Sequence, residues 1–376
     1  MQTRHRMHFG DAAQMSFIPA ESVDLVVTSP PYPMIAMWDA HFSGIDRSID
    51  PALQAGDGLQ AFERMHAVLD PVWREVARIL KPGGMACINI GDAVRSLDGR
   101  FQLYPNHSRV LAVMVELGFA PLPQILWRKP TNAPNKFMGS GMLPPSAYVT
   151  LEHESILIFR KGDKRRFSGN EDRLLRRRSA FFWEERNHWF SDVWMELRGT
   201  GQRQNSGSLR QRSAAFPFEI PYRLILMFSI YEDKVIDPFC GTGTTLLAAM
   251  AAGRNSMGVE LDPEFGRALH NGVSELLALA ADRIQRRIAD HRNFVTERQQ
   301  TGYRFRHINR CHGFPVMTAQ ETDLQLLIPT AVQPCPVETP DYRVEYVPVE
   351  TDAASPPAPV TQPTAGRRKA RQRNMF

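Results

Sequence analysis

The sequence has few cysteines, and they lie far apart. Cys87, Cys240, Cys311 and Cys335 are the only four in 376 residues, and no CxxC pair occurs. Disulfide frameworks and tetrahedral zinc sites both need cysteines at closer and more regular spacing. We therefore predict a protein without a metal site, in a reduced, cytoplasmic setting.

Long apolar segments are also missing. No apolar run approaches the length of about 18 residues that a membrane-spanning helix requires. The N-terminal segment MQTRHRMHFGDA lacks the apolar stretch of a signal peptide. Hydrophobic residues make up 43% of the chain and charged residues 23%, which excludes a mostly disordered protein. We expect a folded protein with no membrane partner.

The net charge is small but unevenly distributed. The 45 Lys and Arg exceed the 40 Asp and Glu by only five. Residues 164–212, however, hold 12 basic and 6 acidic residues, a net charge of +6, so the rest of the chain sums to −1. Eleven of the 12 basic residues are arginines, and seven aromatic residues lie among them. This composition is typical of a nucleic-acid surface, and the arginines suit contacts with guanine. The aromatic residues also suit a small core, and we expect most of them to be structural.

The body of the chain alternates β-rich and helical segments. Strands are expected at residues 6–9, 23–28, 85–90, 124–127, 155–159, 234–236 and 256–260. Helices are expected at residues 62–80, 110–117, 220–230 and 246–252, with an apolar stripe from Val273 to Ile288 on a further long helix. The alternation predicts a mostly parallel, doubly wound α/β sheet of the Rossmann-like kind, with helices on both faces. Such sheets bind ligands at the carboxyl ends of their strands.

The C-terminal part has a different composition. The apolar pattern fades beyond about Pro315, nine prolines lie between Pro329 and Pro363, and the chain ends in the basic sequence GRRKARQRNMF. Chains of this composition rarely bury enough apolar surface to fold. We predict that residues 315–376 form a disordered tail, which either adds non-specific affinity for nucleic acid or serves only solubility.

The first motif is Thr28-Ser29-Pro30-Pro31-Tyr32, directly after an expected strand. The prolines remove backbone donors, so that nearby carbonyls face a ligand. The Ser29 oxygen and such a carbonyl are two acceptors, suited to the two hydrogens of an exocyclic amine. The Tyr32 ring is suited to stack on a base drawn out of a duplex. Alone, the motif is more typical of an ordinary strand and turn, and the second motif is what favours the catalytic interpretation.

The second motif is Asp237-Pro238-Phe239-Cys240-Gly241-Thr242-Gly243-Thr244-Thr245, between an expected strand and an expected helix. Its glycines permit a tight turn, and the helix N-terminus suits a carboxylate. Leu246 stands where a dinucleotide fingerprint has its third glycine, and no Gly-Lys-Ser/Thr follows, which disfavours NAD and a P-loop. Glu260, at the end of the next expected strand, is placed to bind ribose hydroxyls.

Together these motifs resemble the beta-class amino DNA methyltransferases. The matching pieces are TSPPY, then DPFCGTGTT and GVELD, with RILKPGG, QILWRKP, EHESILIFRKG and AAFPFEIPYRLI around them. Members of that family transfer a methyl group from S-adenosylmethionine to N4 of cytosine or N6 of adenine. Their catalytic block precedes the cofactor block, and a target-recognition region lies between the two. The resemblance covers roughly residues 7–277.

The resemblance implies roles for individual residues. Ser29, Pro30, Pro31 and Tyr32 correspond to the catalytic block. The cofactor loop would contain Asp237, Phe239, Gly241 and Gly243, with Thr244 and Thr245 capping the helix near the methionine carboxylate. Glu260 would hold the ribose, Asp11 would lie near the adenine, and Thr28 would end the catalytic strand beside the cofactor. Phe216 and Pro217 belong to the element that covers the methionine end.

The resemblance also implies a domain order and partners. Residues 1–163 would be the catalytic half, 164–212 the target-recognition insert and 213–314 the cofactor-binding half. Double-stranded DNA is the expected partner, and a cognate restriction endonuclease often accompanies such enzymes. The oligomeric state stays open.

The SPPY form is typical of N4-cytosine enzymes, since adenine-modifying members usually carry Asp or Asn at the position of Ser29. N6-adenine methylation and a DNA-binding protein with an inactive fold remain alternatives. Cytosine C5 chemistry needs a nucleophilic cysteine, usually after proline, and the only Pro-Cys pair, Pro334-Cys335, lies in the expected tail.

Two further pairs of residues have open roles. Trp38 and Asp39 lie in a segment that either closes over the flipped base or is plain surface. His153 and Glu154 begin an expected strand, where we expect them to be structural or to shape the rim of the target pocket.

Overall fold

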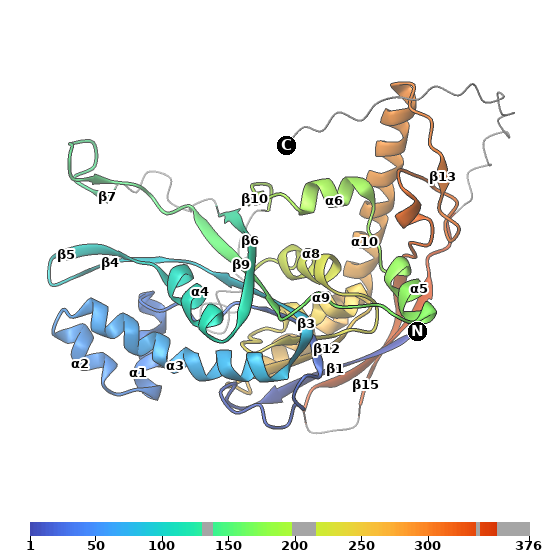
Figure 1. Ribbon diagram of the computed structural model, residues 1–376. Coiled ribbons are helices and arrows are strands. Elements are labelled where there is room, and N and C mark those ends of the chain that lie inside the picture. Colours follow the sequence, from blue (N-terminus) through green and yellow to red (C-terminus); the bar gives the residue numbers. More distant parts are fainter. Residues whose placement is uncertain (130–137, 198–215, 336–338, 352–376) are drawn as a thin grey trace, which may run out of the picture.

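The computed structural model describes residues 1–129, 138–197, 216–335 and 339–351. They form a large sheet with helices on both faces (Figure 1). The order of the strands is β10 (Val193–Trp194), β6 (Phe119–Arg128), β9 (His153–Lys161), β3 (Leu80–Ile90), β2 (Val23–Thr28), β11 (Lys234–Asp237), β12 (Asn255–Glu260), β1 (Gln2–Phe9), β16 (Asp341–Pro348) and β15 (Leu327–Pro334).

Five neighbouring strands form the parallel centre of the sheet, in the order β3, β2, β11, β12 and β1. On one side β9 runs antiparallel to β3, and on the other β16 runs antiparallel to β1. The prediction of a mostly parallel, doubly wound α/β sheet is confirmed. The order is permuted along the chain, because β2 from the first motif lies beside β11 from the second.

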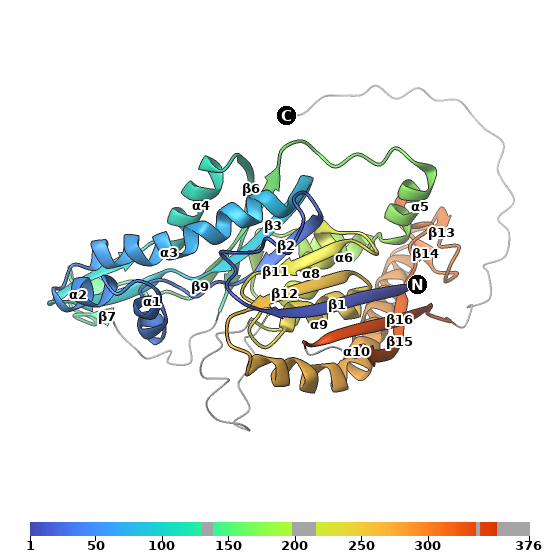
Figure 2. The ribbon, with the colours of Figure 1, turned by 90° about the horizontal axis from the view of Figure 1, so that it is seen from below.

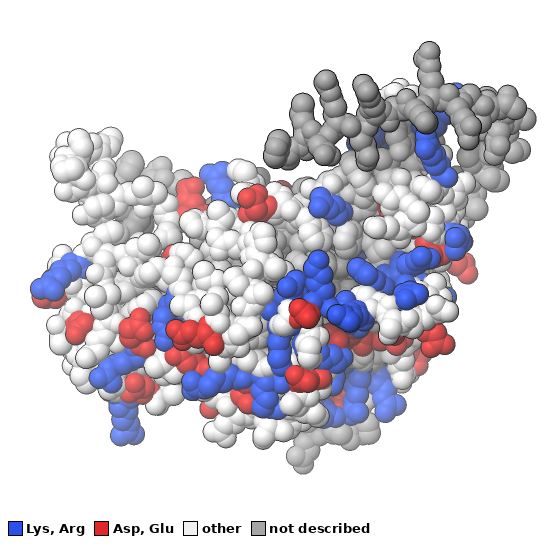
Figure 3. Space-filling view, in the orientation of Figure 1, with Lys and Arg blue, Asp and Glu red and all other residues white. Residues whose placement is uncertain are grey.

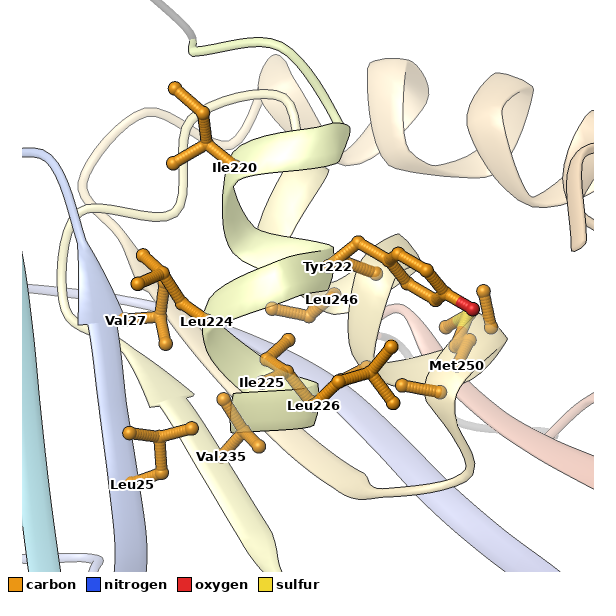
Figure 4. Close-up of a cluster of buried hydrophobic side chains, with 14 of the residues drawn as sticks. Leu25, Val27, Ile220, Tyr222, Leu224, Ile225, Leu226, Val235, Leu246 and Met250 are labelled. Carbon is orange, nitrogen blue, oxygen red and sulfur yellow. The ribbon is translucent and has the colours of Figure 1, made fainter. Parts of the chain in front are cut away.

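Alternating side chains of β2 explain why both faces are covered. Leu25 and Val27 pack into a cluster with α8 (Glu219–Phe228), α9 (Thr244–Ala252) and the start of α10 (Phe265–Gln300), part of which Figure 4 shows. Val26 faces the opposite cluster, with α3 (Gly58–Ile79) and α4 (Asn106–Glu116). All six residues of β2 are buried, as expected for a central strand between two layers.

The remaining elements lie around this core. The first motif is followed along the chain by η1 (Ala36–Trp38), α1 (Asp39–Ile45) and α2 (Ile49–Gln54). The hairpins β4 (Ala93–Leu97) with β5 (Arg100–Tyr104) and β7 (Met138–Gly139) with β8 (Ala147–Tyr148) lie on the same side of the molecule as α1 and α2 (Figure 1). The second half of α10 packs on α6 (Trp183–Trp189) and on β14 (Pro315–Val316). Strand β13 (His307–Ile308) pairs with β14, and η2 (Ala319–Glu321) follows it along the chain. A buried ion pair joins α6 and α10, with Arg287 Nε 2.5 Å from Glu185 Oε1. Among the described helices, none is long and apolar enough to cross a membrane.

The prediction of disorder is wrong for much of residues 315–376. Strands β15 and β16 extend the main sheet beyond β1, and Tyr342, Val344 and Tyr346 are buried against it. Among the described residues, Pro334 and Pro348 end strands, Pro329 lies at the bulge of β15 and Pro340 directly precedes β16, and sheets tolerate proline at such positions. Residues 352–376 lie outside the described residues.

The basic segment at residues 164–212 divides into parts with different surroundings. Phe182, Trp189 and Trp194 are buried, as expected of structural aromatics. The run up to α5 (Asn170–Arg178) crosses the amino ends of the central strands: Arg165 Nη1 is 2.7 Å from Asp233, just before β11, and 3.6 Å from Asp24, near the start of β2. In Figure 2, β1 runs from the side of α5 toward the side of α1. Residues 198–212 lie outside the described residues.

Candidate active site and cofactor cavity

A cavity of about 830 Å³ lies where the central parallel strands end. Its wall contains Asp11 after β1, Ser29 after β2, Asp237 at the end of β11 and Glu260 at the end of β12. Residues so far apart in the chain meet here because parallel strands end at a shared edge of the sheet. The two sequence motifs therefore face one space.

Ser29, Pro30 and Pro31 line the cavity, as the first motif predicts. Tyr32 does not belong to the lining: its side chain is 7% exposed, and its hydroxyl lies 3.0 Å from Ser29 Oγ and 2.9 Å from Glu154 Oε2. The expectation of a Tyr32 ring open for base stacking is not met in this structure, because these bonds hold the ring in the protein interior. Burial raises the pKa of Tyr32 well above that of a free phenol, so the hydroxyl keeps its proton.

The glycines of the second motif shape the turn from β11 into α9. Gly241 and Gly243 have φ angles of +51° and +82°, in the left-handed region that favours glycine. A Cβ atom on Gly243 would lie 2.6 Å from Leu269 Cδ1, which is closer than packing allows. Helix α9 begins at Thr244 on the cavity wall, so its N-terminus, with unpaired backbone N–H groups, lies at the cavity.

Asp237 is the centre of a buried hydrogen-bond cluster. Its two carboxylate oxygens accept from Thr28 Oγ1 and Thr245 Oγ1, each at 2.6 Å, and Oδ1 also accepts from the Phe239 backbone N–H at 3.0 Å. Thr28 and Thr245 are fully buried and do not line the cavity. Burial raises the pKa of Asp237 to about 6. Thr28 and Thr245 hold the loop in shape from within, which differs from the cofactor contact expected of them, whereas Asp237 also reaches the cavity wall.

Glu260 connects the loop to the end of β12. Its Oε2 accepts from the Gly241 N–H at 2.7 Å and its Oε1 from the Asp262 N–H at 3.0 Å. Burial raises the pKa of Glu260. Each carboxylate oxygen keeps a second lone pair, so the side chain can still accept from ligand hydroxyls in the cavity.

Several lining residues were not predicted from the sequence. Helix α3 contributes Val68, Leu69 and Val72, and Leu261 follows Glu260 with 54% of its surface exposed. A helix that lies tens of residues after the first motif and far before the second carries no local signal of its contact with the cavity, whereas Leu261 could have been found as the neighbour of Glu260. Phe216 and Phe239 line the cavity as expected.

The segment after the first motif forms another side of the cavity. Trp38 and His41 line it, and burial lowers the pKa of His41, so this ring is neutral at pH 7. Asp39 instead forms a two-bond pair with Arg95 on β4, with oxygen–nitrogen distances of 2.7 and 2.8 Å. This pair ties α1 to the β4–β5 hairpin and so fixes the wall that carries Trp38.

The donor and acceptor set suits S-adenosylmethionine. Apolar side chains suit an adenine ring, the Glu260 carboxylate suits ribose hydroxyls, and the α9 N-terminus suits a carboxylate. Cys240 is buried, and burial raises the pKa of its thiol, so it is not an activated nucleophile. No group of three or more His, Cys, Asp and Glu that could hold a metal ion occurs within the described ranges.

Known proteins resemble this chain both in sequence and in length. A family model described as DNA methylase matches residues 23–271. The chain is 51% identical over 330 residues to the Type II methyltransferase M.MthZI of Methanothermobacter thermautotrophicus, covering 88% of this chain and 92% of that protein. It is 48% identical over 293 residues to the Type II methyltransferase M.MjaI of Methanocaldococcus jannaschii, covering 75% and 94%.

Solved structures share the fold. TTHA0409 of Thermus thermophilus, solved in complex with S-adenosyl-L-methionine, is 34% identical, with a TM-score of 0.55, covering 72% of this chain and 96% of that one. The cytosine-N4-specific PvuII DNA methyltransferase matches at 21% identity and a TM-score of 0.50, covering 71% and 85%, which shows a likeness of fold alone. On the family match and the cavity together, this chain belongs to the DNA methylase family of N4-cytosine and N6-adenine methyltransferases, whose methyl donor is S-adenosylmethionine.

Proposed function

We propose that this chain is a beta-class, site-specific DNA methyltransferase that modifies N4 of cytosine in duplex DNA. The observation that carries the proposal is Ser29, a neutral hydroxyl on the cavity wall beside Pro30 and Pro31. Adenine-modifying members of the family usually carry Asp or Asn at this position. The order of the motifs, with the catalytic block before the cofactor block, supports the beta class.

The reaction needs acceptors more than it needs a base. The lone pair of an exocyclic amine is conjugated with its ring and is weakly nucleophilic. In our proposal Ser29 Oγ and a backbone carbonyl of the Pro30–Pro31 turn accept the two amine hydrogens. They favour a pyramidal nitrogen and stabilise the positive charge that develops on it, which is a transition-state effect. The bound S-adenosylmethionine would supply an electrophilic methyl group, and no covalent enzyme intermediate is involved. The methylated nitrogen then loses one proton to water, which leaves the neutral methylamino group.

Cofactor binding is assigned to the carboxyl ends of the strands. Glu260 accepts from the ribose hydroxyls, while Asp11 and Phe239 flank the adenine. Gly241, Gly243 and Thr244 present the α9 N-terminus to the methionine carboxylate. Asp237, Thr28 and Thr245 hold this loop from within.

The target base is assigned to the side of the cavity formed by Trp38 and His41. Both rings line the same cavity as Ser29 and are suited to stack on a flipped base. We assign target recognition to the part of residues 164–212 that follows α5, because the run up to α5 lies at the opposite edge of the sheet.

A restriction endonuclease is the proposed functional partner. M.MthZI and M.MjaI are both named Type II methyltransferases, and they cover most of this chain. Methylation by this protein would then protect a sequence that a cognate nuclease cleaves.

Single-molecule sequencing of DNA from a methylation-free host that expresses the protein tests the proposal. We expect N4-methylcytosine at a fixed position of one short sequence. N6-methyladenine at such a position would support the alternative, since the Ser29 hydroxyl can accept from either amine.

A further inference from the structure

A chain of buried hydrogen bonds continues from Ser29 into the protein interior. Tyr32 hydroxyl lies 3.0 Å from Ser29 Oγ, 2.9 Å from Glu154 Oε2 and 2.9 Å from Asn89 Nδ2. Asn89 Nδ2 also donates to Glu154 Oε2 at 2.7 Å, and Lys129 Nζ lies 2.7 Å from Glu154 Oε1. Asn89 is 2% exposed and Glu154 is 8% exposed, so water does not replace these partners.

The directions of these bonds follow from counting hydrogens. Glu154, paired with Lys129, is ionised and can only accept. The single hydrogen of Tyr32 therefore goes to Glu154, and the Tyr32 oxygen has two lone pairs left. One lone pair accepts from Asn89, and the other accepts the hydroxyl hydrogen of Ser29.

With its hydrogen committed to Tyr32, Ser29 has only lone pairs to offer the cavity. We propose that Glu154 is a positioning residue that acts through Tyr32 to hold Ser29 as a hydrogen-bond acceptor for the target amine. The inference rests on the proposed function of Ser29, and it gives Tyr32 a task that its burial permits. If these hydrogen bonds ran in the opposite direction, the Ser29 hydrogen would point at the amine, and two donors would face each other.

The packing around these hydrogen-bonded side chains restricts their positions. A Cβ atom on Gly91 would lie 3.0 Å from Tyr32 Cε2 and 3.3 Å from Glu154 Cγ, so the missing side chain at Gly91 makes room for both. Asn89 and Glu154 lie on the adjacent antiparallel strands β3 and β9, which fixes their spacing.

Replacing Glu154 by Gln should reverse the direction of the hydrogen bonds from Tyr32 to Ser29. Lys129 attracts the amide oxygen of the new side chain, which turns its NH2 group toward Tyr32 and toward the Asn89 NH2 group, so that the Asn89 NH2 group loses its acceptor at residue 154. Tyr32 then donates to Ser29, and the Ser29 hydrogen turns into the cavity. In E154Q we expect the single-turnover rate of labelled methyl transfer to DNA to fall roughly 10-fold to 100-fold, somewhat less than the loss of a whole stabilising group. The Kd for S-adenosylmethionine and the KM for DNA should stay near those of the unmodified protein.

A second substitution restores the direction. In the double variant K129M/E154Q no cation holds the amide oxygen, so this oxygen can face Tyr32 and Asn89 again. We expect the double variant to be faster than E154Q, by roughly 3-fold or more, because one hydrogen-bond direction is recovered. A merely structural role of Glu154 predicts the opposite, since the double variant removes more native contacts.

The matched control is Glu152→Gln, which changes an exposed carboxylate two residues away, paired with Arg128 on the surface. We expect E152Q to keep the rate. A rate for E154Q equal to that of E152Q, a double variant as slow as E154Q, or a parallel loss of thermal stability and cofactor affinity in E154Q would each overturn the proposal. Total methyl transfer is measured, so label found on adenine would refute the choice of base and leave the test of Glu154 intact.

Discussion

At the scale of single residues, burial gives Asp237 an unusual titration. The carboxylate accepts three hydrogen bonds, yet burial outweighs them and raises its pKa to about 6, from 3.8 in an exposed chain. The folded protein therefore binds a proton at Asp237 more tightly than the unfolded chain does. The contribution of this residue to stability is fully present below pH 3.8 and is lost as the pH rises through about 6.

The substitution Asp237→Asn isolates this effect. As the pH rises from about 4.5 to 7.5, the unmodified protein should lose stability relative to the variant. The change in the difference between their unfolding free energies should be on the order of 2 kcal/mol. Urea unfolding at several pH values measures it. A difference that is constant over this range would show that the two states share one pKa at this residue.

The sequence was informative about single residues where the signal is local. Ser29, Pro30 and Glu260 follow directly on strands and reach the cavity as expected. The role of Glu154 was not predictable, because its partners Tyr32 and Asn89 are 122 and 65 residues away and meet it only through strand pairing. The interior positions of Thr28 and Thr245 likewise depend on their shared partner Asp237.

At the scale of elements, the turn from β11 into α9 decides the form of the cofactor side. Gly243 precedes the helix with a φ angle of +82° and lies against Leu269 of α10. Leu269 is fully buried, and its own Cβ and Cγ lie 3.3 Å from the position that a Cβ atom would take at Gly243, so a rotation of the Leu269 side chain alone does not make room.

We expect Gly243→Ala to destabilise the protein by about 2–4 kcal/mol, the sum of backbone strain and overpacking, and to weaken S-adenosylmethionine binding. Gly302→Ala is the matched control, because Gly302 has the same φ angle of +82° and no neighbouring atom within 4 Å. It should cost only the strain, about 1–2 kcal/mol. Chemical unfolding and calorimetric titration measure both effects, and equal losses in the two variants would refute the steric argument.

The elements were predicted unevenly for a related reason. Strands and helices of the central sheet have clear periodicity, so residues 23–28 and 246–252 lie within the observed β2 and α9. Strand β16 also alternates buried and exposed residues over Asp341–Pro348. The many prolines around this short pattern led instead to the prediction of disorder. Its stability comes from pairing with β1, more than 330 residues earlier in the chain, which composition does not reveal.

At the scale of the whole molecule, the basic side chains near α5 and the candidate active site lie at opposite edges of the sheet. In Figure 3, Lys and Arg side chains gather over the region that Figure 1 labels α5. The six residues of β2 separate this edge from Ser29 by about 20 Å at roughly 3.3 Å per residue. That is more than twice the Debye length of ~8 Å at physiological salt, so the α5 charges act only weakly in the cavity.

Replacing Arg173, Arg176 and Arg177 by Gln should therefore leave the methylated sequence unchanged. All three side chains are exposed and far from the cavity, and any loss should appear as weaker, salt-dependent DNA affinity. Sequencing of DNA methylated by the triple variant checks this. A changed target sequence would show that α5 takes part in target recognition.

The central claim is that Ser29 accepts hydrogens from a cytosine amine during methyl transfer. The most direct measurement incubates the purified protein and its Ser29→Ala variant with duplex DNA and methyl-labelled S-adenosylmethionine, and separates the nucleosides. We expect label in N4-methylcytosine alone, with a rate for the variant lower by about 10²–10³ at unchanged DNA affinity. Label in N6-methyladenine, or equal rates for the two proteins, would contradict the account.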